Sequence, residues 1–596
     1  MVRGIVFMFI IVGVAASASA EHLAQDQRSK AQRSARSAGD MNAPPPFLVA
    51  QQVEDQTSPT RPSGDEQGLE VREFLVEGNT LLAPEKIKEI VDKYLGQNRS
   101  FRELEKAKQE LEAAYHAKGY VSVVVTLPEQ TIENGTVRLE VIEARLGAIK
   151  VLENRYYSQW NIRGKLPSLN VGDLLYEPAL VKDLDALNAN PDLKVVPTLK
   201  PGAEPGLINV ELKTSDRLPF HGRVQADNQG PLFTPRNRLT LEGQYTNLFD
   251  ADHILTVKTV QTPEDFGAVQ SYAVSYVAPI KWPDHLLSVY FSKSVFTASL
   301  PVANLPVGGS SVNIVGNATA AGVRYFFPVF PKLPGSHKLS VGADFLRLER
   351  TEATFPGLLG SATVLSPIQY TPVSVGYAGS LLDRWGMTEF GVTARGYCCG
   401  IIPDGRKADF GGDPNDPFNK PGSRAGASGS FAVVRGSLDR RHTLPYGFDL
   451  RLRLDGQWAS EPLIPAEAYF AGGYETVRGY INFEALGDHA VRGRAELTTP
   501  ELIPIPVDYF WQRRRSSEWA IKWRLAGFYD AVNLWVQDPL PGQRDQFRLE
   551  GAGWGLRVTL PKKIGEVHID QGYALQNLSQ TKAGDSFVHF VVSLGF

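Results

Sequence analysis

From about Leu218 to the C-terminus, apolar and polar residues alternate in segments of roughly ten residues separated by turn residues. The stretch 446–458 shows this pattern best: one face carries Tyr446, Phe448, Leu450, Leu452, Leu454 and Trp458, and the other carries Asp449, Arg451, Arg453, Asp455 and Gln457. A strand with one charged and one apolar face fits water on one side and hydrocarbon on the other. A soluble two-sheet sandwich is the alternative, but it would need a second sheet to cover the apolar face. The pattern predicts a mostly β protein with a transmembrane β-barrel of about sixteen strands at residues 215–596.

Residues 68–145 follow a different pattern, in which helical periods interrupt the strands. Ser100 and Glu103 form a capping box at the start of one helix, and Gly119 ends it. The apolar stripe of this helix is Leu104, Ala107, Leu111, Ala114 and Tyr115. We expect the order β-α-α-β-β, with a strand at 71–76, helices at 82–95 and 100–118, and strands at 120–127 and 136–142.

A similar order recurs at residues 146–214. The pattern favours a strand at 148–151, a helix at 177–187, and strands at 194–199 and 207–212. We therefore predict two small α+β domains in tandem, at 68–145 and 146–214, before the barrel.

The first 67 residues carry targeting and linker signals. Arg3 precedes an apolar run from Ile5 to Ala16, and Ala18-Ser19-Ala20 follows. This order is typical of a secretory signal peptide, which predicts export and cleavage after Ala20. Residues 21–67 are mostly polar and predict a linker, with a helix at 21–38.

Composition and charge exclude several classes of function. The chain has 62 basic and 65 acidic residues, so charge gives no reason to expect nucleic acid as a partner. We find no nucleophile elbow, zinc-binding helix or phosphate loop, and expect neither catalysis, cofactor nor metal. Asp413-Pro414-Asn415-Asp416 could suggest calcium, but proline turns explain it more simply. The two cysteines, Cys398 and Cys399, are adjacent and cannot join distant parts of the fold; we expect an inert loop pair.

Several motifs resemble the outer-membrane transporters of two-partner secretion, the hemolysin activator/secretion type. Those in the predicted α+β domains resemble the two polypeptide-transport-associated (POTRA) domains of that family, and those after residue 226 resemble the start of its barrel. The motifs are Phe74-Leu75-Val76-Glu77-Gly78-Asn79-Thr80, Leu127-Pro128-Glu129-Gln130, Leu187-Asn188-Ala189-Asn190-Pro191-Asp192, Leu199-Lys200-Pro201-Gly202, Asp227-Asn228-Gln229-Gly230 and Asn247-Leu248. Phe596 ends an alternating strand and resembles the signal that the barrel-assembly machinery reads.

The most specific resemblance is Gly472-Gly473-Tyr474-Glu475-Thr476-Val477-Arg478-Gly479-Tyr480, which is similar to the signature loop of the family. The resemblance implies that this loop folds back into the barrel and that Arg478 pairs with an inward aspartate. The candidate is Asp530, which we place at the inner face of a strand end. Val532 departs from the family, where a glycine is usual. A second Val491-Arg492-Gly493 lies on an alternating strand, and we interpret it as barrel wall.

The resemblance implies a bacterial outer-membrane pore, surrounded by lipid, with periplasmic POTRA domains that recognise an unfolded exoprotein before its export. It also implies contact with the barrel-assembly machinery during biogenesis. In such transporters an N-terminal helix sometimes plugs the pore, so the helix at 21–38 is either a plug or only a tail. The main alternative is an assembly or insertion factor for other outer-membrane proteins, which often carries more POTRA domains. A passive porin, which lacks such domains, and an outer-membrane enzyme are less favoured.

Overall fold

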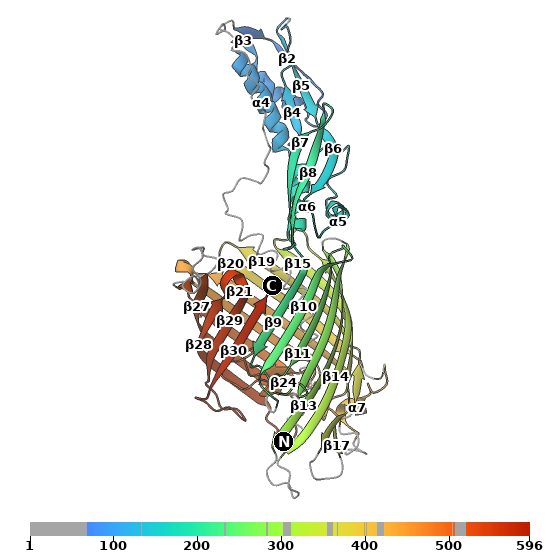
Figure 1. Cartoon of the computed structure of the whole chain (residues 1–596), viewed down its shortest axis with the longest axis vertical. Coiled ribbons are helices and arrows are strands. Elements are labelled where there is room, and N and C mark those ends of the chain that lie inside the picture. Colours follow the sequence, from blue (N-terminus) through green and yellow to red (C-terminus); the bar gives the residue numbers. More distant parts are fainter. Residues whose placement is uncertain are drawn as a thin grey trace. The chain divides into compact units, whose positions relative to one another are not determined.

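The computed structural model describes residues 68–596 except 133, 232–233, 282–283, 302–310, 355–360, 366, 399, 401, 414–421, 503–504 and 507–519. The predicted signal peptide, the predicted helix at 21–38 and most of the 413–416 turn lie outside these residues. The chain divides into two compact units, and the boundary between them in the sequence falls between Pro219 and Phe220, five residues beyond the predicted boundary. Figure 1 shows the elements of each unit. In the described part of the chain, no helix has both the length and the apolarity needed to cross a membrane.

The first α+β domain contains a three-stranded sheet with two helices. Its elements are β1 (Leu69–Val71), β2 (Glu73–Glu77), α3 (Pro84–Val91), a 3₁₀ turn (Asp92–Tyr94), β3 (Gly96–Arg99), α4 (Phe101–Ala117), β4 (Val123–Thr126) and β5 (Thr136–Glu143). The sheet order is β2-β5-β4, with β2 parallel and β4 antiparallel to β5. The predicted strand at 71–76 is in fact two strands, because β1 turns away to pair with β3, which the sequence pattern did not reveal.

Helix α4 begins as the sequence predicts. The Glu103 carboxylate accepts a hydrogen bond from the Ser100 main-chain N–H at 2.8 Å, which completes the capping box. Leu104, Ala107, Leu111 and Tyr115 are buried against the sheet. The predicted helix at 82–95 is shorter than expected, since α3 ends at Val91 and tightens into the 3₁₀ turn.

The second α+β domain repeats this topology. Its elements are β6 (Arg145–Leu152), α5 (Gln159–Gly164), α6 (Glu177–Asn188), β7 (Leu193–Pro201) and β8 (Leu207–Asp216). The sheet order β6-β8-β7 matches β2-β5-β4 in both position and direction. The sequence pattern missed α5, which is too short to display a helical period; the Ser158 side chain caps it by accepting from the Asn161 N–H.

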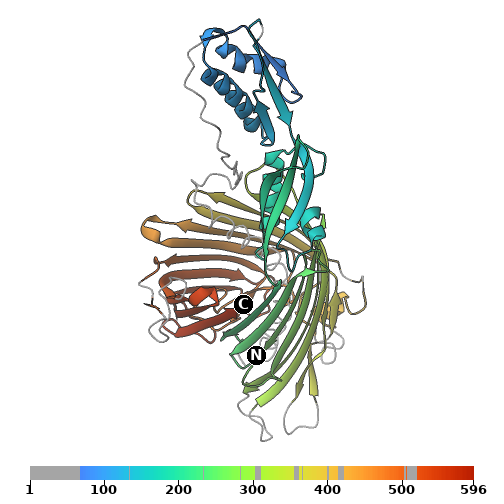
Figure 2. The ribbon, with the colours of Figure 1, turned by 45° about the horizontal axis from the view of Figure 1, so that its top comes forward.

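Most of the strands after Pro219 close into an antiparallel barrel (Figures 1 and 2). Sixteen strands form the wall in the described residues, as predicted. They are β9 (Phe220–Asp227), β10 (Arg238–Leu248), β11 (His253–Gln261), β12 (Val269–Lys281), β13 (His285–Pro301), β14 (Ser311–Pro328), β15 (Ser336–Leu348), β19 (Val373–Asp383), β20 (Gly386–Tyr397), β21 (Phe431–Thr443), β22 (Asp449–Ala459), β25 (His489–Thr498), β27 (Ala520–Trp535), β28 (Gln546–Thr559), β29 (Gly565–Ala574) and β30 (Ser586–Gly595). Four short segments join the same sheet, namely β16 (Thr351–Thr354), β17 (Ser361–Leu365), β18 (Ile368–Tyr370) and β26 (Ile505–Pro506).

The two faces of β22 differ as the alternation predicts. Leu452, Leu454 and Trp458 are about half exposed on the outer face, at 45%, 51% and 54%. Tyr446 was expected on this strand but lies in the preceding 3₁₀ turn with a φ of 62°. The apolar outer and charged inner faces therefore arise from strand geometry, and the turn sets where the alternation begins.

The barrel closes where its last strand meets its first. β30 pairs with β9 over five residues, from Val591↔Asp227 to Gly595↔Arg223. Beyond the end of β9, the Asn228 side-chain amide donates to the Val588 carbonyl at 2.8 Å and accepts from the Phe590 N–H at 3.0 Å. Phe596 is 78% exposed at the other end of this joint.

Candidate functional site

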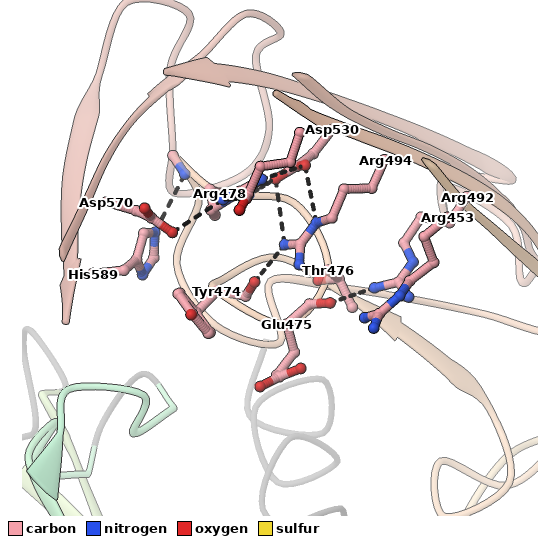
Figure 3. A network of polar contacts seen from close by, with 12 residues as sticks. Arg453, Tyr474, Glu475, Thr476, Arg478, Arg492, Arg494, Asp530, Asp570 and His589 are labelled. Carbon is pink, nitrogen blue, oxygen red and sulfur yellow. Dashed lines mark hydrogen bonds and ion pairs between the residues drawn. The ribbon is translucent and has the colours of Figure 1, made fainter. Parts of the chain in front are cut away.

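The segment between β22 and β25, residues 460–488, folds back into the barrel lumen. It forms a short hairpin from β23 (Tyr469–Ala471) and β24 (Ala485–Gly487), and the predicted motif lies at its tip. Figure 3 shows this tip surrounded by side chains of the barrel wall. Val477, Arg478 and Tyr480 are all at most 1% exposed. The motif is therefore an interior element and not a solvated surface loop.

Arg478 is the polar centre of the tip. Its Nε and Nη2 donate to the two Asp530 oxygens at 2.8 and 3.0 Å, and its main-chain N–H donates to Asp530 Oδ2 at 3.1 Å. Nη1 donates to Glu496 at 2.7 Å and to Asp570 at 3.0 Å. The guanidinium carbon lies 3.3 Å from the centroid of the Phe528 ring. The sequence-predicted pair is thus brought together, and two more carboxylates join it.

Two wall arginines balance these carboxylates. Arg494 Nε donates to Asp530 at 3.0 Å, and Arg557 donates to Asp570 at 2.5 Å and to Glu496 at 3.1 Å. Asp530 and Asp570 are fully buried. Burying charge is tolerated only when partners and hydrogen bonds compensate the lost hydration. Three arginines facing three carboxylates meet this requirement.

Glycine determines how closely the tip approaches the wall. Gly479 has a φ of +97°, a conformation that residues with a Cβ rarely adopt. On the wall, a Cβ at Gly551 would lie 2.0 Å from the Arg478 carbonyl oxygen, and one at Gly572 would lie 2.5 Å from the Gly479 nitrogen. These glycines leave the space in which the loop main chain contacts the strands.

The neighbouring motif residues fix the tip by apolar packing. Val477 and Tyr480 belong to a buried cluster with Ala471, Ala485, Ala490, Val532, Leu534, Leu549 and Ala574. The Tyr480 hydroxyl donates to the main-chain carbonyls of Glu550 and Gln576, each at 3.0 Å. Val532 therefore does not distort the strand; it supplies the apolar surface beside Val477.

Wall side chains also bind the loop main chain. Arg492 donates to the Glu475 carbonyl, Arg494 to the Tyr474 carbonyl at 2.5 Å, and the Gly479 N–H donates to His589 Nε2 at 3.3 Å. Arg492 lies on β25, so the second Val-Arg-Gly segment belongs to the barrel wall, as predicted.

The sequence reasoning missed some residues and misplaced one. Asp530 was expected at a strand end, but β27 runs from Ala520 to Trp535, so the carboxylate lies inside the strand. Asp570 and His589 were not anticipated. The alternation of inward and outward residues along β29 could have placed Asp570 on the inner face, but no local sequence pattern indicates a role for His589. Cys398 is a free, exposed thiol, and Cys399 lies outside the described residues.

Comparisons with known proteins agree with the resemblance of the sequence. A family model described as "POTRA domain, ShlB-type" matches residues 69–144, and one described as "Haemolysin secretion/activation protein ShlB/FhaC/HecB" matches residues 410–514. The chain is 22% identical over 415 residues to the heme/hemopexin transporter protein HuxB of Haemophilus influenzae (strain 86-028NP), covering 68% of each protein.

Solved structures share the fold. CdiB from Escherichia coli superposes with a TM-score of 0.62 at 17% identity, covering 98% of each chain. BamA from Haemophilus ducreyi lacking POTRA domains 1–3 superposes with a TM-score of 0.53 at 14% identity, covering 88% of this chain and all of that one. Both structures therefore share the fold of this chain, and the second family model spans the lumenal loop. On these matches, the chain is similar to outer-membrane transporters of the two-partner secretion type.

Proposed function

We propose that this chain binds an unfolded exoprotein through its α+β domains and secretes it through the barrel. The observation that carries the proposal is the loop 460–488, which lies in the segment matched by the secretion family and is fixed inside the lumen by Arg478. A loop held by ion pairs inside the polar lumen lies in the path of an exported polypeptide. Its ion pairs could break and re-form as the polypeptide passes. Val477, Arg478, Gly479, Tyr480 and Asp530 are the residues to which we assign this role.

Recognition by the α+β domains would use main-chain pairing, because an exposed sheet edge accepts an extended segment whatever its side chains. Hydrogen bonds from neighbouring groups already engage part of three of the four edges of the two sheets. On β4, the Val123 and Val125 N–H groups donate to the Tyr120 carbonyl and to Glu112. On β7, Asn188 binds both main-chain groups of Val195.

The start of the β6 edge is bound by a neighbouring loop. Its Leu146 main chain exchanges hydrogen bonds with Gly172 and Asp173, and Arg145 bridges to Leu174. Among the hydrogen bonds of the described residues, none blocks the outer edge of β2. Leu75, in the middle of β2, is 46% exposed. We therefore assign β2 as the edge at which an extended segment of the exoprotein docks.

Site-specific photo-crosslinking tests this assignment in the full chain. A photo-reactive residue at Leu75 should trap the exoprotein during export, whereas the same residue at Val124, which is 47% exposed on β4, should not. Stronger trapping at Val124 would overturn the choice of edge.

The export function itself is tested by co-expression. The chain, placed in a heterologous host with the secreted protein encoded beside it, should release that protein into the medium, and an empty vector should not. If the protein stays in the periplasm although the barrel is folded in the outer membrane, the export function is wrong.

An insertion factor is the second candidate, favoured by the superposition on BamA. It would change the folding of other outer-membrane proteins, so comparing the levels of folded porins with and without this chain separates the two functions.

Biogenesis would involve the barrel-assembly machinery, with Phe596 as its contact. The exposed terminal ring supports this proposal. Deleting Phe596 should lower the amount of folded barrel, and unchanged levels would remove Phe596 from assembly.

A further inference from the structure

The lumenal loop carries a second buried charge, of the opposite sign to Arg478. Glu467 lies just before β23, and its side chain is 1% exposed. Oε1 accepts from the Tyr370 hydroxyl at 3.0 Å and lies 3.3 Å from Arg395 Nη2. The Glu467 main-chain carbonyl accepts from Arg435 at 3.0 Å and from Gln457 at 3.2 Å. Both the side chain and the main chain of this residue are thus bound to the wall.

The wall around Glu467 is rich in arginine, whereas the wall around Arg478 is rich in carboxylates. Arg395, which bridges β20 to the loop, also lies 3.3 Å from Asp344 on β15. Asp344 in turn accepts from Arg324 on β14 at 3.0 Å and from Tyr290 on β13 at 2.7 Å. The loop therefore places a cation in one part of the wall and an anion in another.

The two contacts differ in strength. Arg478 makes five hydrogen bonds of 2.7–3.1 Å. Glu467 Oε2 has no hydrogen-bond partner among the described residues, and it lies 3.8 Å from Arg435 Nη2. An ion pair at this distance lacks the short, directed hydrogen bonds that make charge-assisted pairs strong.

Losing Glu467 and losing Arg478 would also leave different charges without partners in the barrel wall. Without Glu467, Arg395 keeps Asp344, and Arg435 keeps its 2.7 Å bond to Gln457. Without Arg478, by contrast, the three wall carboxylates would lose a shared cation in a buried site. Leaving a buried charge uncompensated is the costly outcome.

We propose that Glu467 is a second, releasable anchor of the loop, so that residues 460–471 detach from the arginine-rich wall while Arg478 holds the tip in place. The anchoring is a property of the barrel by itself; its use in opening the export path rests on the function proposed above. Glu467 is a positioning residue, since it acts through the loop.

Hydrogen exchange of the full chain in lipid nanodiscs, without any exoprotein, tests this directly. Glu467→Gln keeps the size and removes the charge, and Glu475→Gln is the matched control, because Glu475 is an exposed carboxylate of the same loop. In Glu467→Gln, exchange at 463–471 should rise about tenfold while exchange at 474–481 stays at the wild-type rate. Glu475→Gln should change neither segment.

Unchanged exchange at 463–471 would overturn the anchor, and a joint rise in both segments would overturn independent release, because it would show one rigid body. Tyr370→Phe removes a single bond to Glu467 and should produce a smaller rise confined to 463–471, which keeps the test available if Glu467→Gln fails to fold. Arg478→Gln should show the reverse, with the larger rise at 474–481. Since no exoprotein is present, these results stand whether or not the chain exports one.

Discussion

The α+β domains and the barrel lumen bury their side chains in opposite ways. Each small domain buries apolar side chains between its sheet and its helices, such as Leu111, Val123 and Leu139 in the first. The lumen instead buries arginines and carboxylates around a loop. Apolar packing depends on volume and has no direction, whereas the lumenal contacts depend on charge and on hydrogen-bond geometry. Substitutions that change side-chain volume should therefore affect the α+β domains most, and substitutions that remove a charge should affect the lumenal loop most.

The largest expected effect comes from removing the α+β domains. Deleting residues 68–214 should abolish export while the barrel still inserts, because in the described residues no wall strand pairs with a strand of the α+β domains. Heat-modifiable electrophoretic mobility reports the folded barrel, and the exoprotein in the medium reports export. Normal secretion by the truncated chain would show that the α+β domains are not the receptor.

A single charge in the lumen should come next. Arg478→Ala should reduce export to near background, with barrel levels close to wild type, since no strand pairing is lost. Breaking a buried pair costs about 3–5 kcal/mol in comparable proteins. Arg478→Lys should restore little, because an ammonium cannot reproduce the guanidinium fork.

Asp530→Ala should impair export less, since Arg478 keeps Glu496 and Asp570, and the double variant should be little worse than Arg478→Ala. Lys582→Ala, on an exposed turn, is the control. Additive defects would argue against a direct pair between Arg478 and Asp530.

The stability of the α+β domains should depend on the volume of their buried side chains. Leu139 is fully buried in β5, and Leu139→Ala should lower the unfolding free energy of the first domain by about 2–5 kcal/mol. Val124→Ala, on the exposed face of the same sheet, should have a much smaller effect. Protease resistance of residues 68–219 in the full chain measures both, and equal losses would mean that burial does not determine stability here.

The smallest effect should be electrostatic and local. The Ser100 main-chain N–H and then Arg99 hold the pKa of Glu103 below its usual 4.5. Because the pKa of Glu103 is lower in the folded state, its ionised carboxylate stabilises the fold at pH values above the pKa of the unfolded chain. This stabilisation is lost as the pH falls through the folded-state pKa. Hydrogen exchange at the start of α4 should therefore be faster in Glu103→Gln at neutral pH and equal to wild type in acid; a difference that persists in acid would exclude the charge as its cause.

Periodic features were predictable from sequence, and features made by distant contacts were not. The barrel, its inner and outer faces and the capping box each repeat or sit within a few residues, so a local pattern reveals them. The β1–β3 pairing joins segments that have no shared pattern, and α5 is shorter than two helical turns.

The same distinction applies to the lumenal site. Arg478 and Asp530 could be proposed because a family motif and a strand phase marked them. Gly551, Gly572 and His589 could not, because their importance lies in what approaches them. A glycine on a strand has no local signature for a loop that lies 73 residues (for Gly551) or 93 residues (for Gly572) earlier in the chain.

Asn228 has a consequence for how the barrel finds its register. A strand that slides along its neighbour by two residues keeps its inward and outward faces, so the alternation of apolar and polar residues cannot prevent such an error at closure. The Asn228 side chain binds the Val588 carbonyl and the Phe590 N–H together, in the manner of a peptide group, and a slide of β30 against β9 would break both bonds. One amide beside a five-residue joint thus marks a single alignment of the first and last strands, and with it the stagger and the width of the pore.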